Sequence, residues 1–128
     1  MRPDPNFALV AWMNRQPAES VWTTAVTIFE IRFGIELLPD GRRKYQLEAS
    51  FTHCLKEDLH ERVLDLDRDA AHRAAAMAAQ RTLGGRPLDF RDVEIASIVA
   101  SRRATLATRN TRHFENLGIE LINPWLDK

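Results

Sequence analysis

Two acidic residues occupy helical positions at which a soluble protein usually places apolar side chains. Glu30 shares a helical stripe with Val26 and Phe33, and Asp92 shares one with Val99. A carboxylate drawn toward a core costs several kcal/mol unless it is paired, hydrogen-bonded or bound to a metal. Two such acids from distant segments therefore predict one acidic cleft that holds a divalent cation.

Both acids also have a purely structural interpretation, which the sequence leaves open. Asp92 falls at the third position of its predicted helix, where the helix dipole alone favours an acidic side chain. Glu30 could form a structural ion pair with Arg32 or with another arginine. The residues alone do not choose between these roles and metal binding.

The remaining candidates carry weaker signals. Arg109 and Arg112 could contact the phosphates of a nucleic acid, although exposed arginines usually face solvent. His113 is predicted to pack or cap beside Phe114. None of the four histidines has the spacing of metal ligands, and all are interpreted as non-ligands: His53, His60, His72 and His113. The sequence has no glycine-rich phosphate loop, Ser-His-Asp arrangement or CxxC pair.

The composition predicts a single cytoplasmic globular domain. The 128 residues are 45% hydrophobic, which is enough for a real core. Eighteen basic and eighteen acidic residues cancel, so no bulk field attracts nucleic acid or membrane. Cys54 is the only cysteine, and the beginning Met1-Arg-Pro-Asp-Pro lacks the apolar core of a signal peptide. No apolar run approaches the roughly 20 residues that span a bilayer.

Helical and strand patterns alternate along the chain. Helices are predicted over 5–16, 25–38, 42–56 and 67–83 and after Asp89, with strands at 21–23, 62–66, 104–108 and 119–122. This alternation predicts an α/β fold with a largely parallel sheet. Sites in such folds lie at the carboxyl ends of strands. Asp92, in the first turn of its helix, and Asn110, directly after the buried-type strand 104–108, are expected to meet there, with Glu30 entering from a neighbouring helix.

Three segments resemble a family. They are Ile28-Phe-Glu-Ile-Arg-Phe-Gly, the stretch from Gly85-Arg-Pro to Asp92, and the block from Leu106-Ala-Thr-Arg-Asn to Asn123-Pro-Trp. Together they resemble a PIN domain, and most closely the VapC/FitB-type toxins of bacterial type II toxin–antitoxin systems. The likeness covers nearly all of the chain in the expected order. Its most specific part is the C-terminal block.

The resemblance implies a metal-dependent endoribonuclease in a three-layer domain. Its acids would hold Mg²⁺ or Mn²⁺, which activates water for attack on an RNA phosphodiester. The partners would be a cognate antitoxin protein and an RNA substrate, with a homodimer common in the family. Glu30 and Asp92 match two of the family's acids. Asn110 falls where many members have another Asp, and some members have an Asp at the position of His113.

One departure from the family pattern bears on activity. Members begin with an apolar strand that ends in Asp-Thr-Asn, whose Asp is a principal metal ligand, and the sequence shows no such strand. The chain is therefore expected to be a PIN-like domain over 1–128 without its first strand, through a late start codon or a genuine truncation. We expect weaker Mg²⁺ binding, an unpaired edge or gap in the sheet, and weak or no ribonuclease activity alone.

Three hypotheses from different classes follow. The first is a PIN-type toxin ribonuclease that is active when its first strand is restored or supplied. The second is a non-catalytic PIN remnant that binds an antitoxin or RNA. The third is an unrelated α/β interaction domain in which Glu30 and Asp92 are structural.

Overall fold

The strands form two separate parallel pairs. The structure is a computed structural model, and it describes residues 5–126. Strand β1 (Thr23–Thr24) pairs with β2 (Val63–Leu64), and β3 (Thr105–Ala107) pairs with β4 (Glu120–Ile122). No hydrogen-bonded ladder joins the two pairs in the described part of the chain. The parallel pairing of the strands is confirmed, and a missing first strand as the cause of the break between the two pairs stays a prediction.

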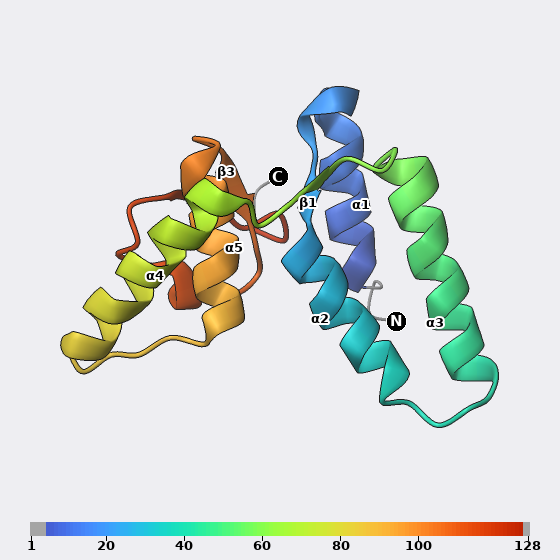
Figure 1. The fold of residues 1–128 in the computed structure, drawn as a ribbon. Helices are drawn as coiled ribbons and strands as arrows, with labels where there is room; N and C mark the ends of the chain where they lie inside the picture. Colours follow the sequence, from blue (N-terminus) through green and yellow to red (C-terminus); the bar gives the residue numbers. More distant parts are fainter. Residues whose placement is uncertain (1–4, 127–128) are drawn as a thin grey trace.

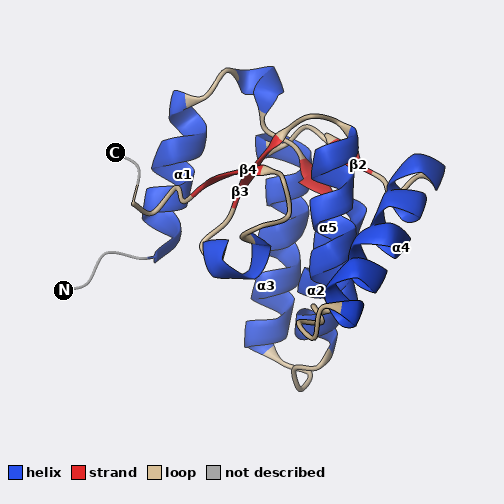
Figure 2. Ribbon diagram, turned by 90° about the vertical axis from the view of Figure 1, so that its left-hand side faces the viewer, coloured by secondary structure: helices blue, strands red, loops and turns tan. Residues whose placement is uncertain are grey.

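Helices make up most of the described chain (Figure 2). The five predicted helices are confirmed, with ends that differ by a few residues. They are α1 (Pro5–Arg15), α2 (Ala25–Glu36), α3 (Arg42–His53), α4 (Arg68–Leu83) and α5 (Phe90–Ser101). Three shorter helical segments are η1 (Ala18–Ser20), the π-helical η2 (Cys54–Asp58) and η3 (Thr111–Phe114). The helix predicted over 42–56 is thus an α-helix continued by a π-helical turn.

Side-chain caps fix the beginnings of three helices. Each capping oxygen accepts a hydrogen bond from a backbone N–H in the first turn, which would otherwise lack a partner. The pairs are Thr24 Oγ1 with Thr27 N at 3.0 Å, Asp67 Oδ1 with Ala70 N at 2.9 Å, and Asp89 Oδ1 with Arg91 N at 2.8 Å. All three caps stand where the sequence predicted a helix to begin.

The strands are shorter and more exposed than predicted. The segment 104–108 was expected to be buried, but Thr105 and Ala107 are exposed and Leu106 is only half-buried. That prediction is wrong because β3 has one strand neighbour, β4, so its other edge is not covered by a second strand. The predicted strand 62–66 likewise pairs only over Val63–Leu64.

The core is centred on α5. Its packing against α4 is the most extensive contact between elements, and α2 reaches the same helix from another side. Figure 1 shows α4, α5 and β3 in one half of the molecule and α1, α2, α3 and β1 in the other. The buried hydrophobic cluster contains Val26, Ala70, Ile95, Ala96, Ile98, Val99 and Phe114. Helix α5 therefore carries both the core and, at its beginning, Asp92.

The α2–α3 half leaves large apolar side chains exposed. Tyr45 and Leu47 are 74% and 39% exposed, and Trp22 is 49% exposed. Phe29 and Phe33 are also exposed and stack with ring centroids 6.2 Å apart. These exposed side chains leave an apolar surface on the α2–α3 half of the molecule. No described helix is long and apolar enough to cross a membrane.

Candidate metal centre

Asp92 projects from the first turn of α5, which the Asp89 cap fixes in place. Its side chain is only 22% exposed, and its Oδ2 lies 3.6 Å from Nδ1 of His113. Burial raises the pKa of the Asp92 carboxyl above its usual value. The charges of His113 and Arg91 act to lower it, and that of Asp89 to raise it further.

Glu30 comes from the middle of α2, which packs against α5. Burial raises the pKa of Glu30 as well, against the lowering effect of Arg91. The negative charges of Asp92 and Asp89 raise the pKa of Glu30 further, so these carboxylates lie within electrostatic reach of one another. Their shared role as metal ligands stays a prediction.

The proposed structural ion pair between Glu30 and Arg32 does not form. Arg32 Nη2 instead contacts the carboxylate of Glu36, one turn further along α2, and lies 4.0 Å from Glu48 Oε1 on α3. The pairing with Arg32 is wrong because Arg32 contacts acidic residues of α2 and α3 instead. An interaction of Glu30 with another arginine stays open, since the charge of Arg91 acts on the Glu30 carboxylate. Glu30 keeps a half-buried carboxylate on the side that faces α5.

His113 does not have the packing role predicted for it. Phe114 is buried, but His113 is 59% exposed and lies beside Asp92. The prediction is wrong because η3 folds back against α5, which brings its imidazole to the start of that helix. The spacing of residues in a motif can indicate ligands that lie on the same helix or strand. The contact between His113 and Asp92 joins residues 21 positions apart on two different elements, so spacing could not predict it.

Arg91 was missed by the sequence reasoning. Its Nε lies 3.3 Å from Asp89 Oδ1, the same oxygen that accepts the Arg91 backbone N–H. This hydrogen bond, with the nearby charges of Glu30 and Asp92, raises the pKa of the Arg91 guanidinium. The available signal was its place between two acids, Asp89 and Asp92, in the first turn of a helix.

The segment after β3 carries the other predicted site residues. Asn110 is exposed at the start of η3, and its N–H donates to Thr108 Oγ1 at 3.1 Å. The Arg109 guanidinium lies over the Trp125 ring, 5.2 Å from its centroid. Arg112 is exposed. Asn110 therefore belongs to the turn that brings His113 to Asp92, whereas Arg109 contacts the closing Asn-Pro-Trp segment.

The donor chemistry fits a divalent metal in part. Carboxylates suit hard cations, and imidazole suits several first-row transition metals. Within 5–126, however, no three or more His, Cys, Asp or Glu side chains are grouped so that they could hold an ion. Asp92 and Glu30 are two suitable ligands, and a stable centre requires at least one further donor.

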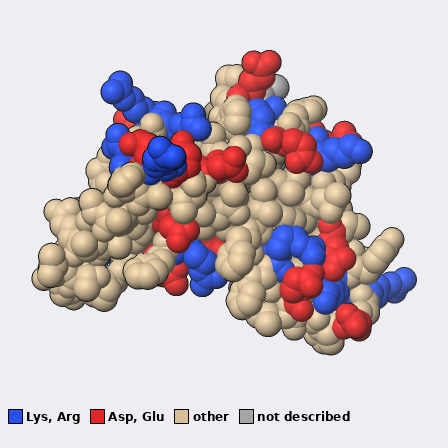
Figure 3. Space-filling model, in the orientation of Figure 1, with Lys and Arg blue, Asp and Glu red and all other residues tan. Residues whose placement is uncertain are grey.

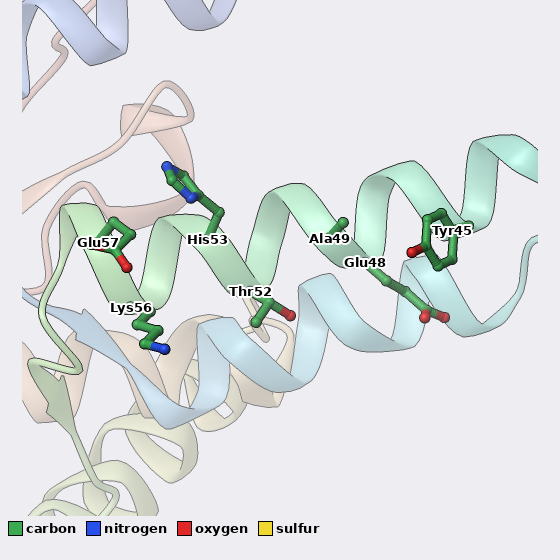
Figure 4. Close-up of a pocket in the computed structure, with 7 residues that line it drawn as sticks. All are labelled: Tyr45, Glu48, Ala49, Thr52, His53, Lys56 and Glu57. Carbon is green, nitrogen blue, oxygen red and sulfur yellow. The ribbon is translucent and has the colours of Figure 1, made fainter.

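Two hollows of the described surface lie away from Glu30 and Asp92. One, of about 430 Å³, runs along α3 and η2, and Figure 4 shows that its labelled side chains all come from that one continuous helical segment. Its lining is Tyr45, Glu48, Ala49, Thr52, His53, Lys56 and Glu57. A second, of about 250 Å³, lies between the end of α1 and the entry to β2. Neither is lined by Glu30 or Asp92.

Charge of neither sign dominates the visible surface. Figure 3 shows acidic and basic side chains intermixed on one face, with wide uncharged areas between them. This agrees with the zero net charge of the sequence. The visible face therefore offers a polyanion separate basic side chains rather than one broad basic patch.

Comparison with known families identifies the chain as a PIN domain. The PIN domain family model matches residues 1–120, and the chain belongs to that family. It is 32% identical to the VapC ribonuclease Y4jK of Sinorhizobium fredii, over 97% of this chain and 89% of that protein. It is 30% identical to Toxin FitB of Neisseria gonorrhoeae, over 99% and 91%. Both findings confirm the resemblance drawn from the sequence.

A solved structure gives the same result for the fold. VapBC-5 from Mycobacterium tuberculosis, described as a member of the VapBC family of toxin–antitoxin systems, superimposes with a TM-score of 0.65. The two chains are 25% identical, with 80% of this chain and 81% of the other covered. The predicted PIN-like α/β fold is thus confirmed, and the hypothesis of an unrelated interaction domain is wrong.

Proposed function

We propose that this chain is the toxin of a type II toxin–antitoxin system, an endoribonuclease that hydrolyses RNA phosphodiester bonds with Mg²⁺ or Mn²⁺. The observation that carries the proposal is the placement of Glu30 and Asp92. Each carboxyl is partly buried with a raised pKa, and they come from helices that pack together within a PIN domain. Acids in such surroundings are typical of functional sites.

The acidic and amide side chains would bind the metal, and the arginines would bind the RNA. A bound divalent cation would supply an acidified water and neutralise charge on the phosphate. Asp92 and Glu30 would hold this cation, and the amide of Asn110 would add a neutral ligand from the turn after β3. Arg109 and Arg112 would contact RNA phosphates beside the centre. The domain would span 1–128.

The partners follow from the same assignment. A cognate antitoxin protein would cover apolar surface such as Phe29 and Phe33 on α2 and Leu37 at the C-cap of that helix, which are 49–69% exposed. A second copy of the chain is the other candidate for such a surface. The toxin would act on cytoplasmic RNA.

A non-catalytic PIN domain that binds an antitoxin or RNA is the second candidate. It is favoured by one observation, the lack of a three-donor group around Asp92 within the described chain. Cleavage separates the two candidates.

The test is cleavage of labelled, structured RNA with Mg²⁺ or Mn²⁺ against an EDTA control. Metal-dependent cleavage that Asp92→Asn reduces at least about 100-fold, with an unchanged melting curve, supports the ribonuclease. The amide keeps the shape of the side chain but loses its charge. RNA or antitoxin binding without cleavage under every metal condition favours the second candidate. EDTA-resistant cleavage contradicts the metal-dependent mechanism.

A further inference from the structure

Arg91 is held in a fixed place at the edge of the acidic centre. Asp89 accepts its backbone N–H at 2.8 Å and its Nε at 3.3 Å through one oxygen, Oδ1. The same Asp89 caps α5, so the start of the helix and the side chain of Arg91 are fixed together. The Arg91 side chain remains 40% exposed and can meet a ligand from solvent.

The surroundings of Arg91 are acidic on several sides. Besides Asp89, two other carboxylates raise the pKa of Arg91 through their negative charge. They belong to Glu30 on α2 and to Asp92, the next residue of α5. The positive charge of Arg91 is the main influence that opposes the effect of burial on the pKa of Glu30, so the guanidinium lies within electrostatic reach of that carboxylate. Within 5–126, the hydrogen bond and ion pair of the Arg91 guanidinium both involve Nε, and no partner is found for its two Nη groups.

We propose that Arg91 binds the RNA phosphate at the acidic centre through its two Nη groups, with Asp89 as the residue that positions it. This inference rests on the proposed ribonuclease function. A guanidinium anchored through Nε still presents a planar fork of N–H groups, which matches two oxygens of a phosphate. An acidic centre repels a polyanion, and Arg91 supplies a fixed positive charge beside Glu30 and Asp92.

The other arginines near the site are less suited to this role. The Arg109 guanidinium already lies over the Trp125 ring. Arg112 is exposed on η3, and no residue of the described chain fixes its side chain as Asp89 fixes that of Arg91. Fixing an arginine before binding lowers the entropy lost when the phosphate arrives. Arg91 is therefore the arginine that would set the position of the phosphate.

The experiment measures binding of a fluorescein-labelled RNA stem-loop by anisotropy, in EDTA, from roughly 50 to 200 mM salt. Arg91→Met loses a charged, bidentate contact, so it should weaken binding about tenfold. It should also lower by about one the slope of the logarithm of the binding constant against the logarithm of the salt concentration. Arg91→Lys should keep the slope but lose several-fold in affinity, because an ammonium lacks the fork. Asp89→Asn, which still caps the helix, should also lose affinity without a change in slope.

The matched control is Arg103→Met, which lies just beyond the other end of α5, a helix of 12 residues and therefore about 18 Å long. It should bind RNA as the unchanged protein does. Thermal melts show whether each variant is folded, and Arg91→Lys carries the test if Arg91→Met is not. Binding by Arg91→Met or Arg91→Lys equal to that of the unchanged protein overturns the role of Arg91 and leaves the ribonuclease proposal intact. If the unchanged protein binds no RNA at any salt, both proposals fail.

Discussion

Without a bound metal, the ionised carboxyls of Glu30 and Asp92 lower the stability of the fold. Burial is the largest cause of the raised pKa of each carboxyl, so the folded protein binds these protons more tightly than the unfolded chain does. The ionised form of a group with a raised folded pKa destabilises the fold at neutral pH, and this effect disappears as the pH falls below the unfolded pKa. A divalent cation would reverse the balance by binding the ionised pair.

The first prediction concerns Glu30→Gln. At pH 7 without metal it should raise the free energy of unfolding, because the amide removes a half-buried charge. The difference should shrink as the pH falls toward 4.5, the ordinary pKa of the group. Urea melts at several pH values measure it, with the exposed Glu115→Gln as control. A difference that grows as the pH falls would contradict the sign.

A second residue-scale prediction concerns Ser97. Its side chain is fully buried in α5, and its Oγ has no hydrogen-bond partner among the described residues. Ser97→Ala should stabilise the protein by about 1 kcal/mol, since it removes an unpaired hydroxyl and favours the helix. The control is Ser101→Ala, whose hydroxyl donates to the Ile98 carbonyl at 2.9 Å. A clear loss of stability in Ser97→Ala, measured by urea denaturation, would show that the hydroxyl has a partner.

Local signals predicted part of the site and tertiary contacts decided the rest. Asp92 and its Asp89 cap could be read from neighbouring residues, because capping acts within one turn. The approach of His113 to Asp92 could not, because it depends on how η3 folds against α5. The role proposed for Arg91 depends on the hydrogen bond that its Nε donates to Asp89 and on the effect of its charge on Glu30. Neither could be predicted from the spacing of residues.

At the scale of elements, helices were easier to predict than strands. The helix beginnings at Thr24, Asp67 and Asp89 have capping side chains, and the structure confirms all three. Strand length and burial depend on neighbours that the sequence does not specify. The two pairs β1–β2 and β3–β4 remain unjoined, which leaves backbone donors and acceptors at open edges.

The element-scale prediction is that an apolar strand of about five residues, added ahead of α1 and ending in Asp, stabilises the protein and raises ribonuclease activity at least about tenfold. A right-handed strand–helix–strand crossover through α1 would place it beside β1, where it can pair. Its Asp would add a carboxylate at the carboxyl end of the sheet.

The matched control for this change is the same strand ending in Asn. It should stabilise the protein equally in thermal melts, but it should give less RNA cleavage than the strand ending in Asp. An extended protein that melts at the same temperature as the 128-residue chain would contradict the pairing of the added strand.

The whole molecule exposes more surface than a compact monomer of its size. The accessible area is 9399 Å², whereas a 14.7 kDa monomer typically exposes about 6,900 Å². Part of the excess is apolar, as in Leu37 at 69% exposed and Tyr45 at 74%. Such surface favours association with a partner protein or with a second copy.

We therefore expect the isolated chain to associate with increasing concentration. Sedimentation velocity should show species larger than 14.7 kDa, and the melting temperature should rise with concentration. Phe33→Glu, on the exposed stripe of α2, should reduce association more than Leu83→Glu at the far end of α4. A clean monomer with a cooperative, concentration-independent melt would contradict this expectation.

The central claim is that Glu30 and Asp92 together hold one divalent cation. Its most direct test is titration of the protein with Mn²⁺, followed by the electron paramagnetic resonance signal of the free ion. We expect one site per chain, which is lost in Asp92→Asn and weakened at least about tenfold in Glu30→Gln, because a hard cation requires charged oxygen ligands. The exposed Glu115→Gln should bind as the unchanged protein does. Mn²⁺ binding that is equal in all four proteins, or absent from the unchanged one, would contradict the claim.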